Sequence, residues 1–270
     1  MVNQLHVMKK IKSLQAYLKY LIFSRHAKGH GIHSPFLYKL IREVFSDRSF
    51  YPGYAIAERM MKKMLHHEEA IKINDLGAGS KISPLTERKI SSIAKTSSIP
   101  KKYGRLLHRL VKFLKPDIIF ELGTSLGISS AYMATGNEQT NIITVEGDSI
   151  LAGIARENLQ LAKLKNIQVW NNNFDDSISE LQQNILSGFL LFIDGNHTYD
   201  AALKYFKSFS RFTNSNTIFI FDDIHWDNNM ERCWNEIWQH PKTTLTIDLY
   251  RLGIVFFNKG FAKQHFTIRY

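Results

Sequence analysis

Nearly continuous apolar runs alternate along the second half of the chain with segments long enough to hold helices. These runs lie at residues 117–122, 142–146, 167–170, 189–194 and 217–222. Strands that are apolar along their whole length are typical of a parallel sheet whose two faces are both covered by helices. The pattern therefore predicts a doubly wound, mostly parallel α/β domain.

The last two apolar runs differ from the others in their connection. Residues 243–250 and 252–257 are separated by a single position. So short a join permits only an antiparallel pair, because a parallel crossover needs a dozen or more residues. We therefore expect an antiparallel last strand.

The first hundred residues carry a helical pattern instead. Apolar positions recur at helical spacing over residues 4–24, with lysines around them, and residues 36–69 also look helical. The sequence thus predicts a basic, mainly helical N-terminal extension over residues 1–99, followed by the α/β domain over residues 100–270. We expect the stripe at 4–24 to dock on the protein's own core or on a second subunit, giving a homo-oligomer, rather than to lie on a membrane surface.

Charge is distributed unevenly between the two regions. Residues 1–115 hold 23 Lys and Arg against 7 Asp and Glu, a net charge of +16, whereas residues 116–270 hold 12 against 17, a net of −5. A basic region attracts phosphates on nucleic acid, on lipid headgroups or on a small substrate. A lysine-rich surface kept for solubility explains the excess equally well.

Cysteine content and hydropathy indicate the compartment. The single cysteine, Cys233, cannot form an internal disulfide and excludes a CxxC metal or redox framework. No window approaches the run of about 18 to 20 apolar residues that a membrane span needs, and the N-terminus lacks the features of a signal peptide. We expect a cytoplasmic protein.

A glycine-rich turn follows the first apolar run of the α/β domain, where ligands bind in open α/β sheets. It runs from Glu121 to Gly127. Gly123 would let the backbone approach a ligand and Gly127 would let the next helix pack closely. Hydroxyl groups come from Thr124, Ser125 and Ser129. The turn lacks the GxGxxG pattern of dinucleotide sites, so a bound pyrophosphate is not expected.

Acidic residues follow the next two runs. Glu146 lies 25 residues after Glu121, about where a ribose-binding acid belongs. Asp175 and Asp176 come after the third run, next to an aromatic residue, and could hold an adenine edge and face. A second glycine loop at residues 75–80 is followed by no apolar strand ending in an acid, so we interpret it as a loop beside the main domain.

These segments resemble a known family. The sequences around FELGTSLGISSAYMA, VEGD, FIDGNHTYD and FIFDD are similar to class I S-adenosylmethionine-dependent methyltransferases, within them the catechol O-methyltransferase-like and macrocin-type sugar O-methyltransferase branch. The resemblance covers roughly residues 100–258 and implies a Rossmann-like, seven-stranded sheet with a reversed last strand. It also implies S-adenosyl-L-methionine as methyl donor, held by Glu121, Gly123, Ser125, Ser129, Glu146 and Asp176.

Three further carboxylates end the fourth and fifth runs: Asp194, Asp222 and Asp223. Hard oxygen ligands of this kind suit Mg²⁺, Mn²⁺ or Ca²⁺. In the resembled branch the corresponding acids bind a divalent cation that clamps the acceptor, although the third position there is often Asn. The alternative is that these acids cap helices or orient the donor without metal.

Two histidines are candidates for the base that deprotonates the acceptor. His197 stands three residues after Asp194, where the resembled enzymes carry a lysine, and His225 stands two residues after Asp223. The predicted activity is O-methylation of a hydroxylated small molecule. The alternative is methylation of RNA or of a protein docked on the basic N-terminal region, although the Asn/Asp-Pro-Pro-aromatic motif of base-nitrogen methyltransferases is missing.

Overall fold

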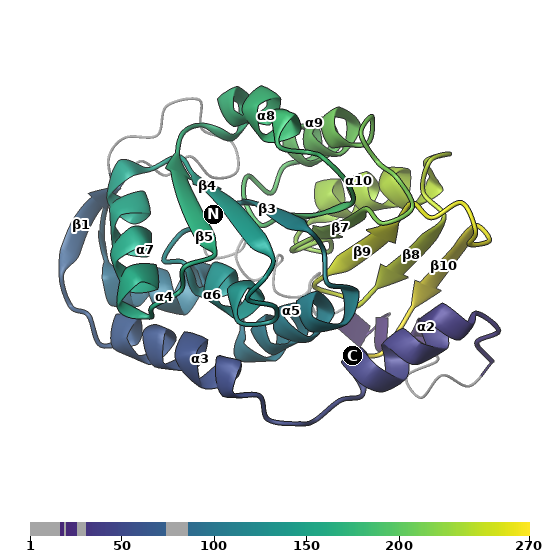
Figure 1. Cartoon of the computed structure of the whole chain (residues 1–270), viewed down its shortest axis with the longest axis horizontal. Coiled ribbons are helices and arrows are strands. Elements are labelled where there is room, and N and C mark those ends of the chain that lie inside the picture. Colours follow the sequence, from purple (N-terminus) through teal and green to yellow (C-terminus); the bar gives the residue numbers. More distant parts are fainter. Residues whose placement is uncertain (1–16, 19, 26–30, 74–85) are drawn as a thin grey trace, which may run out of the picture.

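A computed structural model describes residues 17–18, 20–25, 31–73 and 86–270. Within these residues one eight-stranded sheet forms the centre of the molecule, with strand order β10-β8-β9-β7-β6-β3-β4-β5 (Figure 1). Its strands are β3 (Ile118–Leu122), β4 (Asn141–Glu146), β5 (Ile167–Asn171), β6 (Phe189–Ile193), β7 (Ile218–Phe221), β8 (Leu245–Asp248), β9 (Gly253–Phe256) and β10 (Gln264–Thr267).

Helices cover both faces of this sheet (Figure 1). One face packs against α5 (Lys101–Leu114), α6 (Ile128–Ala134) and α7 (Ser149–Leu161), and the other against α8 (Phe174–Gln183), α9 (Tyr199–Phe209) and α10 (Asn228–Gln239). Successive strand residues alternate between the two cores: in β6, Leu190 and Phe192 belong to the first, and Phe189, Leu191 and Ile193 to the second. Burial on both sides explains why these strands have no polar face.

The observed sheet matches the predicted doubly wound arrangement. Strands β5, β4, β3, β6 and β7 run parallel to one another, and β9 pairs antiparallel with both β7 and β8. The antiparallel pair predicted from the short join is therefore confirmed. The sheet has one strand more than the predicted seven, because β10 adds to β8 in parallel at the edge.

The N-terminal region is less regular than the helical pattern over residues 36–69 suggests. It contains α2 (Pro35–Leu40), a π-helical turn η1 (Ile41–Phe45), α3 (Pro52–Leu65), β1 (Ala70–Ile73), β2 (Thr86–Lys89) and α4 (Ile90–Ser97). Pro52 starts α3 afresh after an extended Tyr51, since proline suits the first turn of a helix and disfavours helical backbone before it. Strands β1 and β2 form a separate antiparallel pair.

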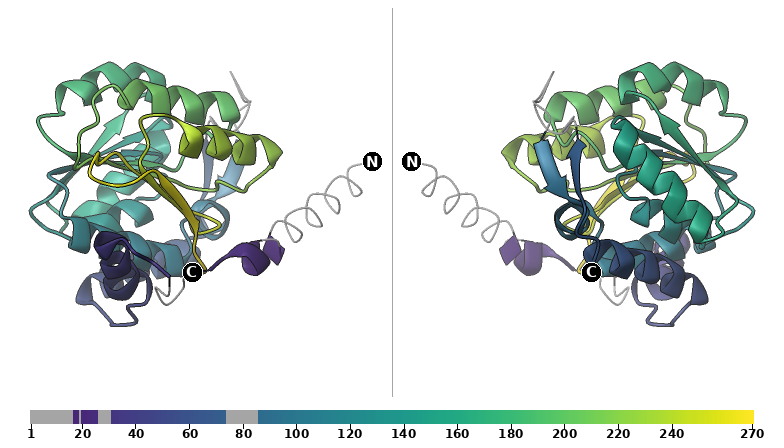
Figure 2. Two further views of the ribbon diagram at one scale, coloured as in Figure 1. Left: turned by 90° about the vertical axis from the view of Figure 1, so that its right-hand side faces the viewer. Right: turned by 90° about the vertical axis from the view of Figure 1, so that its left-hand side faces the viewer.

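The two ends of the described chain meet at the β10 edge. Arg25 forms a parallel β-bridge with Ile268, and the buried Tyr20 hydroxyl donates a 2.7 Å hydrogen bond to the Ile268 carbonyl. The backbone N–H of Tyr270 donates to the same hydroxyl at 2.9 Å. Figure 2 shows residues 17–25 lying beside the C-terminus. The greater part of the stripe predicted at 4–24, and the loop at 75–80, lie outside the described residues. Among those that are described, no helix is long and apolar enough to cross a bilayer.

Arg109 of α5 ties the N-terminal helices and the C-terminus to the domain. Its buried guanidinium donates to the Val44 carbonyl at 2.7 Å, to the Tyr54 hydroxyl at 2.9 Å and to the Tyr270 hydroxyl at 2.8 Å. These three partners come from η1, α3 and the chain end. A planar donor with several N–H groups suits such a junction better than an ammonium would.

We expect Arg109→Met to lower the free energy of unfolding by about 2 kcal/mol, because the Val44 carbonyl and two tyrosine hydroxyls lose a charged donor. Urea denaturation followed by circular dichroism measures the change. Arg48→Met is the matched control: Arg48 is exposed, and we expect a change within about 0.5 kcal/mol. Equal stability of the two variants would show that the Arg109 junction contributes nothing.

Candidate active site

A cavity of about 880 Å³ opens at the carboxyl ends of the central strands. Gly123, Glu146 and Asp194 line it, directly after or at the end of β3, β4 and β6, and Asp223 lines it two residues after β7. Parallel strands all end at one edge, so residues far apart in sequence converge there. The volume lies within the usual range for small-molecule and cofactor sites.

The glycine-rich turn is held by the end of the neighbouring strand. The Ser125 N–H donates to one Glu146 oxygen at 2.7 Å, and the Asp148 N–H donates to the other at 3.0 Å. Gly123, Ser125 and Gly127 have φ values of 112°, 47° and 81°, so the turn leaves ordinary backbone space three times. Glu146 thus fixes the turn's shape as well as presenting a carboxylate to the cavity.

The hydroxyls predicted for this turn take different positions. The Ser125 Oγ is buried in the cavity wall, and no described residue forms a hydrogen bond with it. The Thr124 hydroxyl is paired with that of Thr144 at 2.6 Å, and the Ser129 hydroxyl lies at the start of α6 in the cavity lining. A buried polar group without a partner is costly, so Ser125 is suited to a polar ligand.

Two residues predicted to bind the donor lie behind the cavity lining. Gly127 has a φ of 81° and caps α6, where a Cβ would contact Leu159. Glu121 is fully buried and accepts a short hydrogen bond from the Ser130 hydroxyl. Burial raises the pKa of Glu121 to about 7. The structure therefore places both residues in support of the turn rather than on the cavity surface.

The raised pKa of Glu121 predicts a pH-dependent stability. The folded protein holds this proton more tightly than the unfolded chain, so the free energy of unfolding falls as pH rises from about 4.5 to about 7. We expect Glu121→Gln to remove up to about 3 kcal/mol of this fall. Urea denaturation of both proteins at pH 4.5, 6 and 7.5 measures it. If the free energy of unfolding changed with pH in the same way in both proteins, the raised pKa of Glu121 would be contradicted.

The far wall of the cavity comes from the start of α8 and from the turn after β6. The Phe174 ring packs against Gly195, where a Cβ would come within 2.6 Å of the ring. Asp175 and Asp176 line the cavity from the same turn of α8, and Asp175 pairs with Lys204 of α9 at 2.7 Å. Phe174, Asp175 and Asp176 thus line the same cavity as Glu146 at the end of β4.

At the other end of the cavity, His197 lies between two carboxylates. Its Nε2 is 4.0 Å from Asp194 Oδ1 and 4.0 Å from Asp223 Oδ2. Burial, reinforced by the Asp222 carboxylate, raises the pKa of Asp194 well above its usual range. The same causes raise the pKa of Asp223 to about 6. The cavity lining therefore holds an imidazole flanked by two carboxyl groups.

The cation site expected from Asp194, Asp222 and Asp223 is not formed in this arrangement. Arg251 donates to both oxygens of Asp222, from Nε at 2.8 Å and from Nη2 at 2.5 Å, and Nη2 is 3.5 Å from Asp223. No group of three or more His, Cys, Asp or Glu among the described residues could hold a metal ion. The guanidinium already neutralises the carboxylate that a metal would need.

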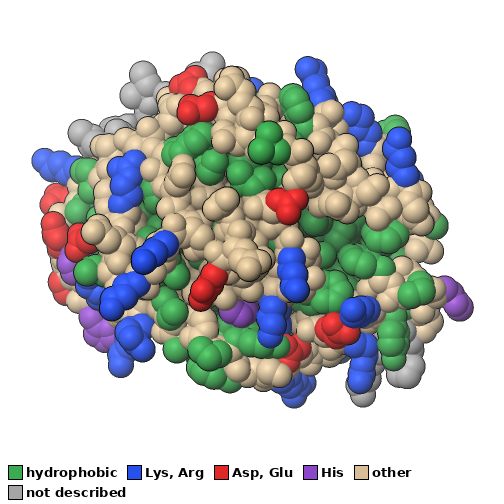
Figure 3. All heavy atoms as spheres, in the orientation of Figure 1, with side chains coloured by type: hydrophobic (Ala, Val, Ile, Leu, Met, Phe, Trp, Pro, Cys, Tyr) green, Lys and Arg blue, Asp and Glu red, His purple; other side chains and the backbone are tan. Residues whose placement is uncertain are grey.

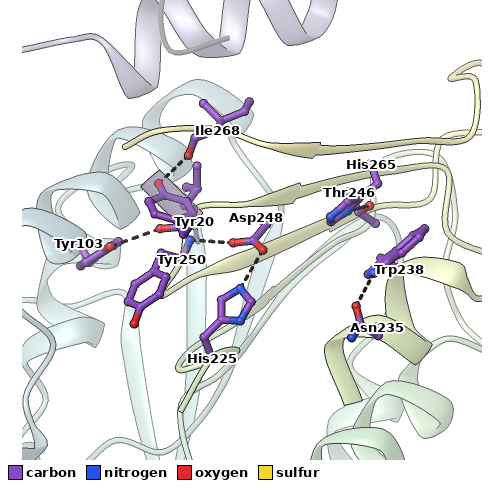
Figure 4. A network of polar contacts seen from close by, with 11 residues as sticks. Tyr20, Tyr103, His225, Asn235, Trp238, Thr246, Asp248, Tyr250, His265 and Ile268 are labelled. Carbon is purple, nitrogen blue, oxygen red and sulfur yellow. Dashed lines mark hydrogen bonds and ion pairs between the residues drawn. The ribbon is translucent and has the colours of Figure 1, made fainter. Parts of the chain in front are cut away.

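The alternative base, His225, does not line the cavity. Its Nε2 lies 2.8 Å from Asp248 Oδ2, and its ring stacks on Tyr250 at 5.5 Å (Figure 4). Asp248 also accepts a 2.7 Å hydrogen bond from the Tyr250 N–H. The structure thus places His225 in a polar network of the β8 edge, and brings His197 alone of the two histidines to the acidic end of the cavity.

Sequence reasoning missed several residues of the cavity. Arg251, which lies in the tight β8–β9 connection, was not singled out by any motif. Ile73, Arg88 and Ser98 bring the N-terminal region into the lining. A lone arginine and scattered hydroxyls carry no periodic signal, so their place depends on the tertiary fold.

The basic character of residues 1–115 does not gather into one patch on the face of Figure 3. Lys and Arg side chains are scattered over this face, several of them in its left part and lower centre, with Asp and Glu among them. Some are paired: Lys101 and Arg105 both contact Glu58 at 2.7 Å. A continuous basic groove, which nucleic-acid backbones require, is missing from this face.

Comparison with solved structures identifies the fold. A protein of Klebsiella pneumoniae assigned as an O-methyltransferase matches with a TM-score of 0.56 and 19% identity, over 80% of this chain and 94% of that one. An O-methyltransferase from Bacillus cereus, solved with SAH, gives 0.55 and 17%, over 81% and 96%. TomG, a Streptomyces achromogenes O-methyltransferase solved with SAM, gives 0.54 and 14%, over 78% and 91%.

Sequence comparison agrees over the central strands. Residues 120–224 match a family model described as a methyltransferase domain, and this range holds β3 through β7 with the strand ends that line the cavity. No curated protein sequence matches the chain. The chain thus has the methyltransferase fold of these structures, and its residues 120–224 are similar to a methyltransferase domain.

Proposed function

We propose that this protein transfers the methyl group of S-adenosylmethionine to a hydroxyl oxygen of a small molecule. The observation that carries the proposal is the convergence of Gly123, Glu146, Asp194 and His197 on one cavity. Its two ends differ in character: one offers hydroxyl, carboxylate and aromatic groups, and the other offers a base among acids. A donor and an acceptor can meet between them.

The donor half is suited to a nucleoside with a charged sulfur. Glu146 can accept hydrogen bonds from ribose hydroxyls, and Phe174 offers a ring face or edge to the base. Ser125 Oγ offers a hydroxyl that forms no hydrogen bond with any described residue. The acids near the sulfonium favour its positive charge in a cavity of low dielectric. Similar solved O-methyltransferases hold SAM or SAH, which supports the same ligand here.

Glu146→Ala is expected to weaken S-adenosylmethionine binding about 30- to 100-fold. The change removes the ribose acceptor and also frees the Ser125 and Asp148 N–H groups that shape the turn. Isothermal titration calorimetry measures the dissociation constant. Glu157 of α7 is exposed, and Glu157→Ala is the control that should leave the dissociation constant unchanged. A dissociation constant of the Glu146→Ala variant within threefold of the wild-type value would show that Glu146 does not bind the ribose.

In the acceptor half, His197 is the group placed to take the hydroxyl proton. As the oxygen bonds to the methyl carbon, the carbon–sulfur bond breaks with its electron pair on sulfur, and the hydroxyl proton moves to His197. Asp194 and Asp223 at 4.0 Å stabilise the imidazolium that results. Assistance by a divalent cation is left out of the proposal, because Arg251 neutralises Asp222.

The acceptor is found by incubating the protein with tritiated S-adenosylmethionine and fractionated cell extract. We expect label in a low-molecular-weight fraction, lost with the Glu146→Ala variant. Label in RNA or protein fractions instead would favour the macromolecular alternative, and a steep salt dependence of RNA binding would support it further.

A further inference from the structure

Arg251 lies at the strand ends where the sequence predicts a divalent cation bound by Asp194, Asp222 and Asp223. It lies between β8 and β9, four residues or fewer from either strand, and reaches back to the end of β7. The Asp222 side chain that it clamps is completely buried, and the Arg251 side chain is 26% exposed at the cavity. A fork of two parallel N–H donors fixes the guanidinium's plane as well as its position.

A divalent cation fits this arrangement poorly. Both Asp222 oxygens are used by Arg251, and Asp223 lies 3.5 Å from the same Nη2. A metal ion bound among these acids would face a fixed positive charge at close range, where repulsion is strong in a buried site. It would have to displace the guanidinium and leave that charge unpaired.

We propose that the Arg251 guanidinium is the built-in cation of the acceptor site and that its Nη1 donors bind the acceptor oxygen. The inference rests on the proposed methyl transfer and adds a hydrogen bond to the reacting oxygen, without changing which bonds form and break. Nη1 makes no hydrogen bond with any described residue, while Nε and Nη2 are occupied. The donors that remain available belong to a residue of the cavity lining.

The charges around Arg251 also define the acceptor class. Two carboxyl groups, Asp222 and Asp223, contact this one guanidinium, and a third, Asp194, lies beside the neighbouring His197. A phosphate or carboxylate on the acceptor would add a further negative charge there. The site therefore suits a neutral hydroxylated molecule, whose oxygen develops negative charge only as its proton moves to His197.

Manganese binding tests the inference without knowledge of the acceptor. Electron paramagnetic resonance titrations of Mn²⁺ compare the wild type with Arg251→Met. We expect no site in the wild type, and at least about tenfold tighter Mn²⁺ binding after Arg251→Met, because both Asp222 oxygens are released. The double variant that combines Arg251→Met with Asp223→Asn should lose the gain in Mn²⁺ affinity. Arg251→Lys, which keeps the positive charge, should show no such gain.

Two results would overturn the inference. One is Mn²⁺ binding by the wild type that Asp222→Asn removes, since the metal would then coexist with Arg251. The other is a folded Arg251→Met variant that gains no Mn²⁺ site, since the guanidinium would then fill no cation position. If Arg251→Met does not fold, the wild-type and Arg251→Lys titrations decide, and binding by either contradicts the inference.

Titration of each protein with S-adenosylmethionine separates this inference from the proposed function. Binding by the wild type together with a failed manganese test rejects the role of Arg251 and leaves the methyltransferase proposal standing. No S-adenosylmethionine binding by the wild type rejects the proposed function, whatever the manganese result.

Discussion

His197→Ala is expected to lower kcat for methyl transfer about 1,000-fold, while the dissociation constant for S-adenosylmethionine stays within about threefold. His197 lies 4.0 Å from Asp194 and from Asp223, and it forms none of the hydrogen bonds between Glu146 and the glycine-rich turn. Its loss removes the imidazole that we propose takes the hydroxyl proton. Initial rates with tritiated donor and the acceptor from the extract screen measure the change.

His225→Ala is the matched control for this experiment. His225 pairs with Asp248 outside the cavity lining, so we expect kcat to change less than about threefold in protein that remains folded. Thermal denaturation monitors folding of both variants. A large loss with His225→Ala and a small one with His197→Ala would reverse the assignment of the base.

Gly123→Ala is expected to lower the free energy of unfolding by about 4 kcal/mol. An added Cβ would lie 2.5 Å from the Asp194 carbonyl oxygen and 2.8 Å from its carbon, both of them backbone atoms that cannot rotate away. The φ of 112° adds strain for any residue with a Cβ. The ends of β3 and β6 would have to separate, which costs packing as well.

Urea denaturation measures this loss, and Gly153→Ala provides the control. Gly153 lies in α7, where an added Cβ would meet nothing within 4 Å. There we expect a gain of about 0.5 to 1 kcal/mol, because alanine is the better helix former. If Gly123→Ala were as stable as the wild type, the close approach of the turn to β6 would be wrong.

The central strands could be predicted from sequence because most of their residues are apolar and are buried on both faces of the sheet. Strands β3, β4, β6 and β7 are apolar on both faces, and the cavity residues follow from their ends. Strand β10 (Gln264–Thr267) and the β1–β2 pair could not be found in this way. They are four residues long and partly polar, and their pairing depends on an edge that only the folded sheet provides.

The candidate site also contains some residues that could be predicted from the sequence and others that could not. Gly123, Ser125, Glu146, Asp194 and His197 belong to strand ends and reach the cavity as expected. Asp222 also follows its strand directly, but its partner Arg251 is 29 residues away in the sequence. No sequence motif marks Arg251 as a cavity residue. A carboxylate's position can be predicted from a strand pattern, whereas the charge that neutralises it depends on a contact between distant loops.

A crystal structure of the protein with S-adenosylhomocysteine tests the central claim most directly. The account predicts that the ribose contacts Glu146, that the adenine lies beside Phe174, and that the sulfur faces Asp194 and His197. A ligand bound outside this cavity, or with its sulfur turned away from His197, would contradict the account.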